Sequence, residues 1–285
     1  MTLRVALALA AAVMGGAASS SAGPTDGFTV RVLNIVDHSR RATFRDGRSA
    51  PRRLVTYVRV PAAPGPRPLV VFAHGFGLTP SVYAPLLDAW ARAGYVVAAP
   101  LFPVENARAP GGPDQDDLVN EPADLRFVIT RLTSSKSTLR ARIDPNRIAL
   151  AGQSDGAVAA LSAAYDRRYL DRRVDAAVIL SGAAFAGFSR PAAGGPPLLA
   201  VQGTADPLNA PSTTVAYYSL MRRPKFLLWL LGASHLPPYT THDRWEPVVA
   251  DATTAFLDHY LGRAPLRPLL AAGDTPGIAR IVADP

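Results

Sequence analysis

The spacing of apolar and polar residues changes along the chain and predicts two kinds of structure. Residues 28–36 and 54–60 alternate apolar and polar side chains, which is typical of strands with one exposed face. From residue 69 onward, short continuous apolar runs alternate with segments whose apolar residues recur at helical spacing. Continuous runs indicate strands covered on both faces. This pattern favours an α/β fold with a mostly parallel central sheet and helices on both faces.

The predicted elements follow one another with short connections. Further strands are expected over residues 69–73, 95–99, 147–151, 176–180, 198–201 and 226–231. Helices are expected over residues 81–93, 121–133, 156–165, 211–221 and 247–260. Asn120 is expected to cap the second helix, and the tail from Gly262 to Pro285 is expected to wrap the surface. Because no break in composition marks a second unit, residues 23–285 are predicted to form one domain.

The first 22 residues have the pattern of an export signal. Arg4 precedes an apolar stretch over residues 5–13, and small residues follow up to Ala22. Ser20-Ser21-Ala22 is a suitable cleavage site before Gly23. The strongly apolar part is too short for a membrane span, which needs about 20 residues. The sequence therefore predicts a secreted protein, either extracellular or in the cell envelope.

Composition narrows the possible functions. The chain has 285 residues, 48% of them hydrophobic, and no cysteine, which excludes disulfides, thiolate metal sites and a cysteine nucleophile. The net charge of +8 raises the question of nucleic-acid binding. However, the arginines are spread along the chain without interleaved stacking aromatics or a known nucleic-acid motif. We therefore predict a solvated basic surface on a monomer without a nucleic-acid partner, and adhesion to anionic envelope or polymer surfaces stays open.

The strongest local motif is Gly152-Gln153-Ser154-Asp155-Gly156, a G-x-S-x-G pentapeptide between a predicted strand and a predicted helix. This context forms a sharp turn that lifts the serine above the sheet edge. Ser154 is the predicted nucleophile. The alternative is that its hydroxyl only caps the following helix.

A serine nucleophile needs a base, and the base needs a carboxylate that holds its tautomer. His235 follows the strand over residues 226–231, and Asp206 follows the strand over residues 198–201. Binding and catalytic side chains of α/β proteins lie at the carboxyl ends of parallel strands, so both positions are suitable for a base and its carboxylate. The chain order Ser154, Asp206, His235 differs from those of chymotrypsin and subtilisin. The alternative for His235 is a structural loop histidine.

Acyl transfer also needs donors for the oxyanion that develops on the substrate. His74-Gly75-Phe76-Gly77 follows a predicted strand and can supply the Phe76 amide, with the Asp155 amide as the second donor. His74 itself is expected to bond beneath the loop. Phe76 and Gln153 are predicted substrate contacts. Further aromatic side chains are compatible with either the substrate cleft or the core: Phe102, Phe185, Phe188, Tyr239 and Trp245.

With these motifs, the chain resembles the α/β-hydrolase superfamily over nearly all of its length. It is most similar to secreted actinobacterial members near the dienelactone hydrolase, chlorophyllase, platelet-activating-factor acetylhydrolase and cutinase branches. The residues that carry the resemblance are the loop at His74, the stretch over residues 91–100, the Ser154 pentapeptide, Gly203-Thr204-Ala205-Asp206 and Ala233-Ser234-His235. The resemblance implies a Ser-Asp-His triad and neither a metal nor a cofactor.

These observations predict an α/β-hydrolase fold with little or no lid and a carboxylic ester hydrolase that works through an acyl-enzyme. A small acyl, lipid-like or polyester ester is the expected substrate. Two alternatives stay open: a peptidase or amidase on the same triad, and a non-catalytic protein that uses the fold to bind the cell envelope.

Overall fold

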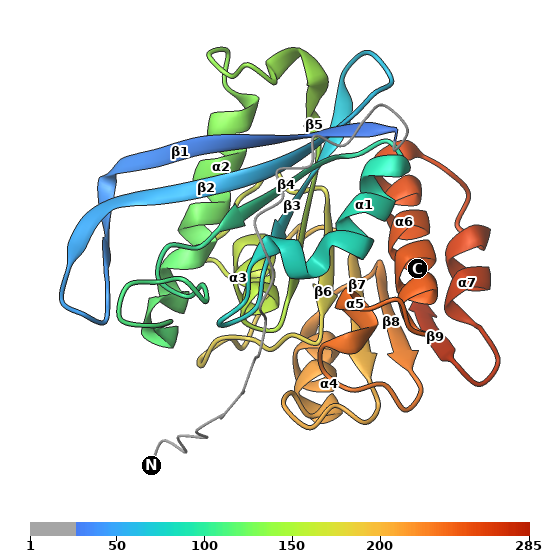
Figure 1. Ribbon diagram of the computed structural model, residues 1–285. Helices are drawn as coiled ribbons and strands as arrows, with labels where there is room; N and C mark the ends of the chain where they lie inside the picture. Colours follow the sequence, from blue (N-terminus) through green and yellow to red (C-terminus); the bar gives the residue numbers. More distant parts are fainter. Residues whose placement is uncertain (1–26) are drawn as a thin grey trace.

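The computed structural model of the protein describes residues 27–285 (Figure 1). The predicted export signal and its cleavage site at Ala22 lie outside the described residues. No helix within the described range is long and apolar enough to cross a lipid bilayer.

In the part of the chain that the structure describes, nine strands form one continuous sheet in the order β1-β2-β4-β3-β5-β6-β7-β8-β9. The strands β3 to β8 run parallel, whereas β1, β2 and β9 pair antiparallel with their neighbours. The mostly parallel α/β sheet predicted from the apolar runs is therefore confirmed. The strands are β1 Phe28–Thr43, β2 Ser49–Pro61, β3 Arg67–Ala73, β4 Val96–Leu101, β5 Ile143–Gln153, β6 Ala176–Leu180, β7 Leu198–Gly203, β8 Lys225–Leu230 and β9 Ala279–Asp284.

Helices cover both faces of the sheet. Alternate side chains of β3 show this division, since Leu69 and Val71 enter one core and Val70 and Phe72 the other. Helices α2 and α3 pack on the first core, and α1 and α6 on the second. The helices are α1 Ala84–Arg92, α2 Glu121–Thr133, α3 Asp155–Tyr165, α4 Pro211–Leu220, α5 Pro237–Thr240, α6 Glu246–Gly262 and α7 Arg267–Gly273.

Two local expectations are wrong. The tail does not simply wrap the surface, because α7 leads into β9, which pairs with β8 and extends the sheet. Asn120 does not cap α2 with its side chain. Its amide instead donates to Asp117 Oδ1 at 2.7 Å, because the segment before α2 is a 3₁₀ turn that brings Asp117 within reach.

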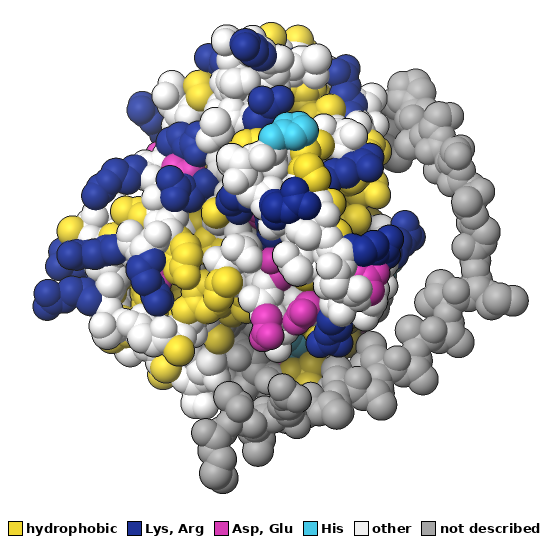
Figure 2. All heavy atoms as spheres, turned by 90° about the vertical axis from the view of Figure 1, so that its left-hand side faces the viewer, with side chains coloured by type: hydrophobic (Ala, Val, Ile, Leu, Met, Phe, Trp, Pro, Cys, Tyr) yellow, Lys and Arg dark blue, Asp and Glu magenta, His cyan; other side chains and the backbone are white. Residues whose placement is uncertain are grey.

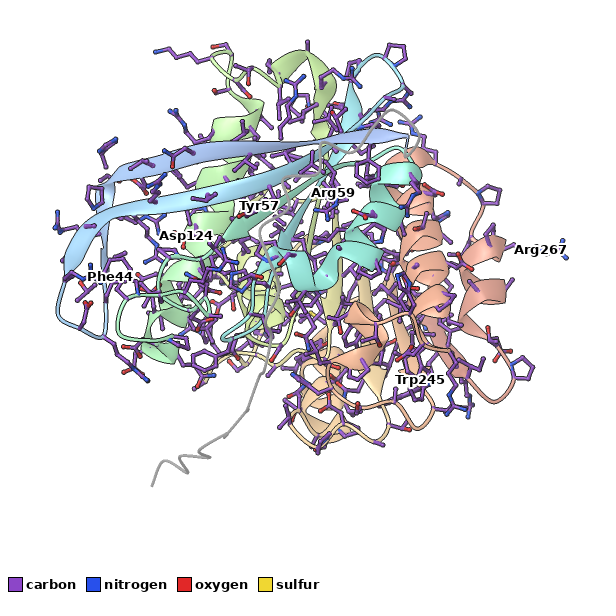
Figure 3. The ribbon with its side chains drawn as sticks, in the orientation of Figure 1. Phe44, Tyr57, Arg59, Asp124, Trp245 and Arg267 are labelled. Atoms are coloured by element: carbon purple, nitrogen blue, oxygen red, sulfur yellow. The ribbon has the colours of Figure 1, made fainter. Side chains whose placement is uncertain are left out.

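The long β1–β2 hairpin is tied to the body of the protein by buried charges. The fully buried Arg52 guanidinium of β2 donates to Asp117 and to Asp124 of α2. Arg59, further along the same strand, pairs with Asp88 of α1 at 2.5 Å. Figure 3 shows Asp124 behind the hairpin and Arg59 where β2 passes α1. Ion pairs therefore connect the hairpin to helices on both faces of the sheet.

Basic side chains are widely spread over the surface. On the face seen in Figure 2, lysine and arginine side chains are interspersed with apolar patches and a smaller group of acidic side chains. Several of the arginines pair with nearby aspartates, such as Arg168 with Asp166 and Arg173 with Asp171.

Candidate active site

The serine of the pentapeptide lies in a strained turn between β5 and α3. Ser154 has φ 56° and ψ −123°, a conformation that non-glycine residues rarely adopt. The flanking glycines allow it: a Cβ at Gly152 would lie 2.2 Å from the Gly156 carbonyl oxygen, and one at Gly156 would lie 2.2 Å from the Ala73 carbonyl oxygen. Ser154 makes no side-chain capping bond to α3, so the alternative of a capping serine is wrong.

The ends of three strands bring Ser154, His235 and Asp206 into one chain of hydrogen bonds. His235 Nε2 lies 2.9 Å from Ser154 Oγ, and His235 Nδ1 lies 2.8 Å from Asp206 Oδ2. Ser154 follows β5, Asp206 follows β7 and His235 follows β8, and all three strands are parallel. Their carboxyl ends therefore meet at one edge of the sheet, as expected from the sequence. Both His235 and Asp206 are buried.

Asp206 is held as an acceptor by several donors. Its Oδ1 accepts the amides of Leu208 and Asn209, both at 2.9 Å, and its Oδ2 accepts from Gln202 at 3.2 Å in addition to His235. Burial alone would raise the pKa of Asp206, but the hydrogen bonds from His235 and from these backbone amides outweigh it and hold the pKa below its ordinary value. A carboxylate at this position keeps the proton of His235 on Nδ1 and leaves Nε2 free to face Ser154.

The loop after β3 is held in place by the buried ring of His74. The Phe102 amide donates to His74 Nε2 at 3.1 Å, so the His74 proton is on Nδ1 and is donated to the Gly75 carbonyl at 2.9 Å. That carbonyl and the Phe76 amide belong to one peptide unit and point in opposite directions. His74 therefore orients the Phe76 N–H from below, as the expected structural role requires. Complete burial lowers the pKa of His74 to about 4, so the ring is neutral at pH 7.

The Asp155 amide is the second candidate donor. It is the first amide of α3, where the helix dipole favours negative charge. Among residues 27–285, neither this amide nor that of Phe76 donates a hydrogen bond to the protein. The Asp155 side chain accepts from Gln115 at 2.6 Å, and burial raises the pKa of this carboxyl.

A cavity of about 550 Å³ opens over Ser154 and His235. The Phe76 side chain lines it and is 39% exposed, so it is available to a substrate. Gln153 also borders the cavity, but its side chain is fully buried and is hydrogen-bonded to Tyr83 and His235. Substrate contact by Gln153 stays a prediction, whereas its internal contacts are established by these distances.

The apolar lining of the cavity is not formed by the aromatic candidates Phe102, Phe185, Phe188, Tyr239 and Trp245. Phe102 and Tyr239 are fully buried, and Trp245 donates its ring N–H to the Leu231 carbonyl at 3.0 Å beside the end of β8 (Figure 3). None of the five aromatic candidates lines the cavity. Its apolar lining beyond Phe76 comes from Leu78, Val158, Ala183, Pro207, Leu208, Leu236 and Pro237. Leu208 and Leu236 lie within two residues of Asp206 and His235, a proximity that could have identified them.

Within residues 27–285, no three histidine, aspartate or glutamate side chains are grouped so that they could hold a metal ion.

Comparison with known families agrees with this geometry. The sequence model of the chlorophyllase family matches residues 27–216, about two thirds of the chain. The chain belongs to the chlorophyllase family. The matched range includes the loop at Phe76, Ser154 and Asp206, whereas His235 lies beyond it. No individual curated protein matches the sequence.

Among solved structures, this chlorophyllase-family chain is similar to a ferulic acid esterase from Streptomyces cinnamoneus. The TM-score is 0.69 at 23% sequence identity, over 85% of this chain and 92% of the esterase. The likeness shows the α/β-hydrolase fold. Membership of the chlorophyllase family together with this fold identifies the protein as a carboxylic ester hydrolase.

Proposed function

We propose that the protein hydrolyses uncharged carboxylic esters through an acyl-enzyme on Ser154. The observation that carries the proposal is the continuous hydrogen-bond chain from Asp206 through His235 to Ser154 at the base of the cavity. A serine, an imidazole and a carboxylate in this order are the groups that acyl transfer requires.

In the first half-reaction, Ser154 Oγ attacks the ester carbonyl carbon while His235 Nε2 takes the hydroxyl proton. The amides of Phe76 and Asp155 stabilise the tetrahedral oxyanion. His235 then gives its proton to the leaving alcohol. In the second half, water attacks the acyl group and gives a proton to His235, which returns it to Ser154 as the acid leaves. Asp206 holds the Nδ1–H throughout and stabilises the imidazolium.

The cavity favours an uncharged substrate with an apolar acyl group. Among residues 27–285, no lysine or arginine lines the cavity to pair with an anionic substrate. The Asp155 carboxyl on its wall would repel such a group when ionised. Small acyl, lipid-like and polyester esters fit these requirements. An aromatic acyl group against Phe76 fits as well, and the fold neighbour is a ferulic acid esterase.

We also propose that the enzyme is secreted and acts as a monomer, without a nucleic-acid partner. The N-terminal export pattern and the dispersed arginines support this view. Adhesion of the basic surface to anionic envelope or polymer material would place the enzyme near its substrates (Figure 2).

A fluorophosphonate probe and an ester panel test the proposed reaction. The panel contains p-nitrophenyl esters of increasing chain length, methyl ferulate, one anionic ester and matched amides. We expect labelling of Ser154, turnover of the neutral esters and poor turnover of the anionic ester. Ser154→Ala should lower kcat by at least about 10⁴-fold. Ser219→Ala, which changes an exposed serine on α4, should leave kcat unchanged.

The outcomes separate the alternatives. Labelling with turnover of amides alone would move the protein to the peptidases and amidases. If the folded protein is not labelled and turns over no ester, the proposed reaction is wrong and a binding role through the same fold takes its place.

A further inference from the structure

The residue before the nucleophile connects three parts of the site. Gly75 N–H donates to Tyr83 Oη at 3.0 Å, and the Tyr83 hydroxyl donates to Gln153 Oε1 at 2.7 Å. Gln153 Nε2 then donates to the His235 carbonyl at 3.1 Å. These bonds run from the loop that carries the Phe76 amide, through Gln153, to the loop that carries the base.

Every donor in this chain points the same way, so the bonds reinforce one another. Tyr83 and Gln153 are fully inaccessible to solvent, and His235 is nearly so. Water therefore cannot replace a lost partner in the intact fold. Burial raises the pKa of Tyr83, so its hydroxyl keeps its proton and remains a donor to Gln153.

The side chains of Gln153 and Tyr83 pack closely against the Gly75 backbone. A Cβ at Gly75 would lie 2.8 Å from Gln153 Oε1 and 3.2 Å from Tyr83 Oη. Gln153 Nε2 also lies 3.3 Å from His235 Nε2, the atom that faces Ser154. Since Gln153 is covalently joined to Ser154, one side chain spans the distance between the nucleophile and the base.

We propose that Gln153 and Tyr83 are positioning residues that hold the loop with the Phe76 amide, the nucleophile and the base in one geometry. This inference rests on the proposed function, because it assigns them a role in the reaction of Ser154. Neither side chain exchanges a proton with the substrate. Their effect is on the placement of His235 relative to Ser154 and of the Gly75–Phe76 peptide relative to the substrate carbonyl.

The test uses Tyr83→Phe, Gln153→Met and the double variant. Kinetics are measured on a p-nitrophenyl ester that the unaltered enzyme cleaves, together with the rate constant of fluorophosphonate labelling. Each single change should lower kcat and the labelling rate about 10- to 100-fold, because small displacements of reacting groups have effects of this size. KM should change less than about threefold. The double variant should be no slower than the slower single variant, because both changes interrupt the same chain.

Tyr165→Phe is the matched control. Its buried hydroxyl donates to the Pro196 carbonyl at 2.9 Å, at the end of α3 away from Ser154. This variant should keep the unaltered kcat even if its melting temperature falls.

Two results with the variants would overturn the inference. One is a set of variants that melt earlier but keep kcat per labelled site, which is the result of a purely structural role. Another is a double variant whose losses multiply, since independent effects multiply. If the unaltered enzyme cleaves none of the esters but is labelled, the substrate assignment fails while the labelling rates still decide the inference. If the unaltered protein is not labelled at all, both fail.

Discussion

At the scale of single residues, the site depends on groups that are costly to place. Ser154 has a strained backbone that its flanking glycines make possible. His74 is completely buried as a neutral imidazole, with both ring nitrogens hydrogen-bonded to backbone groups. Its ring fixes the peptide that carries the Phe76 amide. Because His74 is a titratable group that is buried in its neutral form, the stability of the protein should depend on pH.

His74 should make the protein less stable in acid. Its pKa is lowered to about 4 in the fold from 6.5, so below pH 6.5 the unfolded chain takes up a proton that the folded protein does not. This proton uptake lowers the free energy of unfolding as the pH falls from about 6.5 to about 4, by a total of about 3 kcal/mol. Above about pH 6.5 the ring is neutral in both states and the loss is absent.

Urea unfolding at pH 4, 5, 6 and 7 measures this effect. His74→Gln should be less stable than the unaltered protein at pH 7, and the difference should shrink as the pH falls. Unfolding free energies that keep a constant difference across this range would contradict the expectation.

At the scale of elements, the fully buried Arg52 connects the β1–β2 hairpin to α2. Arg52 reaches from β2 to Asp124 of α2 and to Asp117 in the turn before it, and all three are buried. Buried carboxylates that lose their partner are left desolvated and unpaired. The pairing therefore holds the hairpin against α2 more firmly than surface ion pairs could.

Arg52→Met should destabilise the protein by about 3–5 kcal/mol, because it leaves the charges of Asp117 and Asp124 without their main partner. Arg48→Met is the control, since Arg48 pairs with Asp46 at 2.7 Å on the exposed surface of the hairpin turn. Its effect should stay within about 1 kcal/mol. Equal losses in urea unfolding would show that burial does not decide the strength of these pairs.

At the scale of the whole molecule, a buried carboxyl pair lies where several elements meet. The carboxyl groups of Glu105, in the loop after β4, and Glu121, at the start of α2, lie close enough to interact through their charges, and within residues 27–285 none of their buried oxygen atoms has a hydrogen-bond partner. Burial, followed by the charge of Asp155, raises the pKa of Glu105 to about 9, and burial with the neighbouring Glu105 raises that of Glu121. The Glu105 carbonyl accepts the Gly77 amide at 2.8 Å, which connects the pair to the loop that carries Phe76.

Glu105→Gln should stabilise the protein in mildly alkaline solution. The folded protein keeps a proton up to about pH 9, whereas unfolded glutamate releases it near pH 4.5. Folding therefore becomes less favourable as the pH rises between these values. The amide imitates the protonated acid, so the melting temperature at pH 8 should rise by at least about 3 °C. At pH 4, where both states are protonated, the variant should show little gain; an equal gain at both pH values would contradict this reason.

Much of the architecture could be predicted because it is encoded locally. Continuous apolar runs such as residues 69–73 and 198–201 indicated buried parallel strands, and each of the predicted helices is present. The pentapeptide at Ser154 indicated its own turn, since the glycines and the strand before it are all within reach along the chain. Strand β9 was missed because a short edge strand is defined by its pairing with β8 rather than by its own pattern.

The sequence alone determined the type of sheet, the sharp turn at Ser154 and the order in which Ser154, Asp206 and His235 follow strands. These features arise from short-range patterns and from the rule that parallel strands end at one edge. Only the tertiary structure decided which side chains meet there: Tyr83 with Gln153, Glu105 with Glu121, and the leucines that line the cavity together with Phe76. Those contacts depend on how helices and loops pack over the sheet, and packing joins residues that share no local pattern.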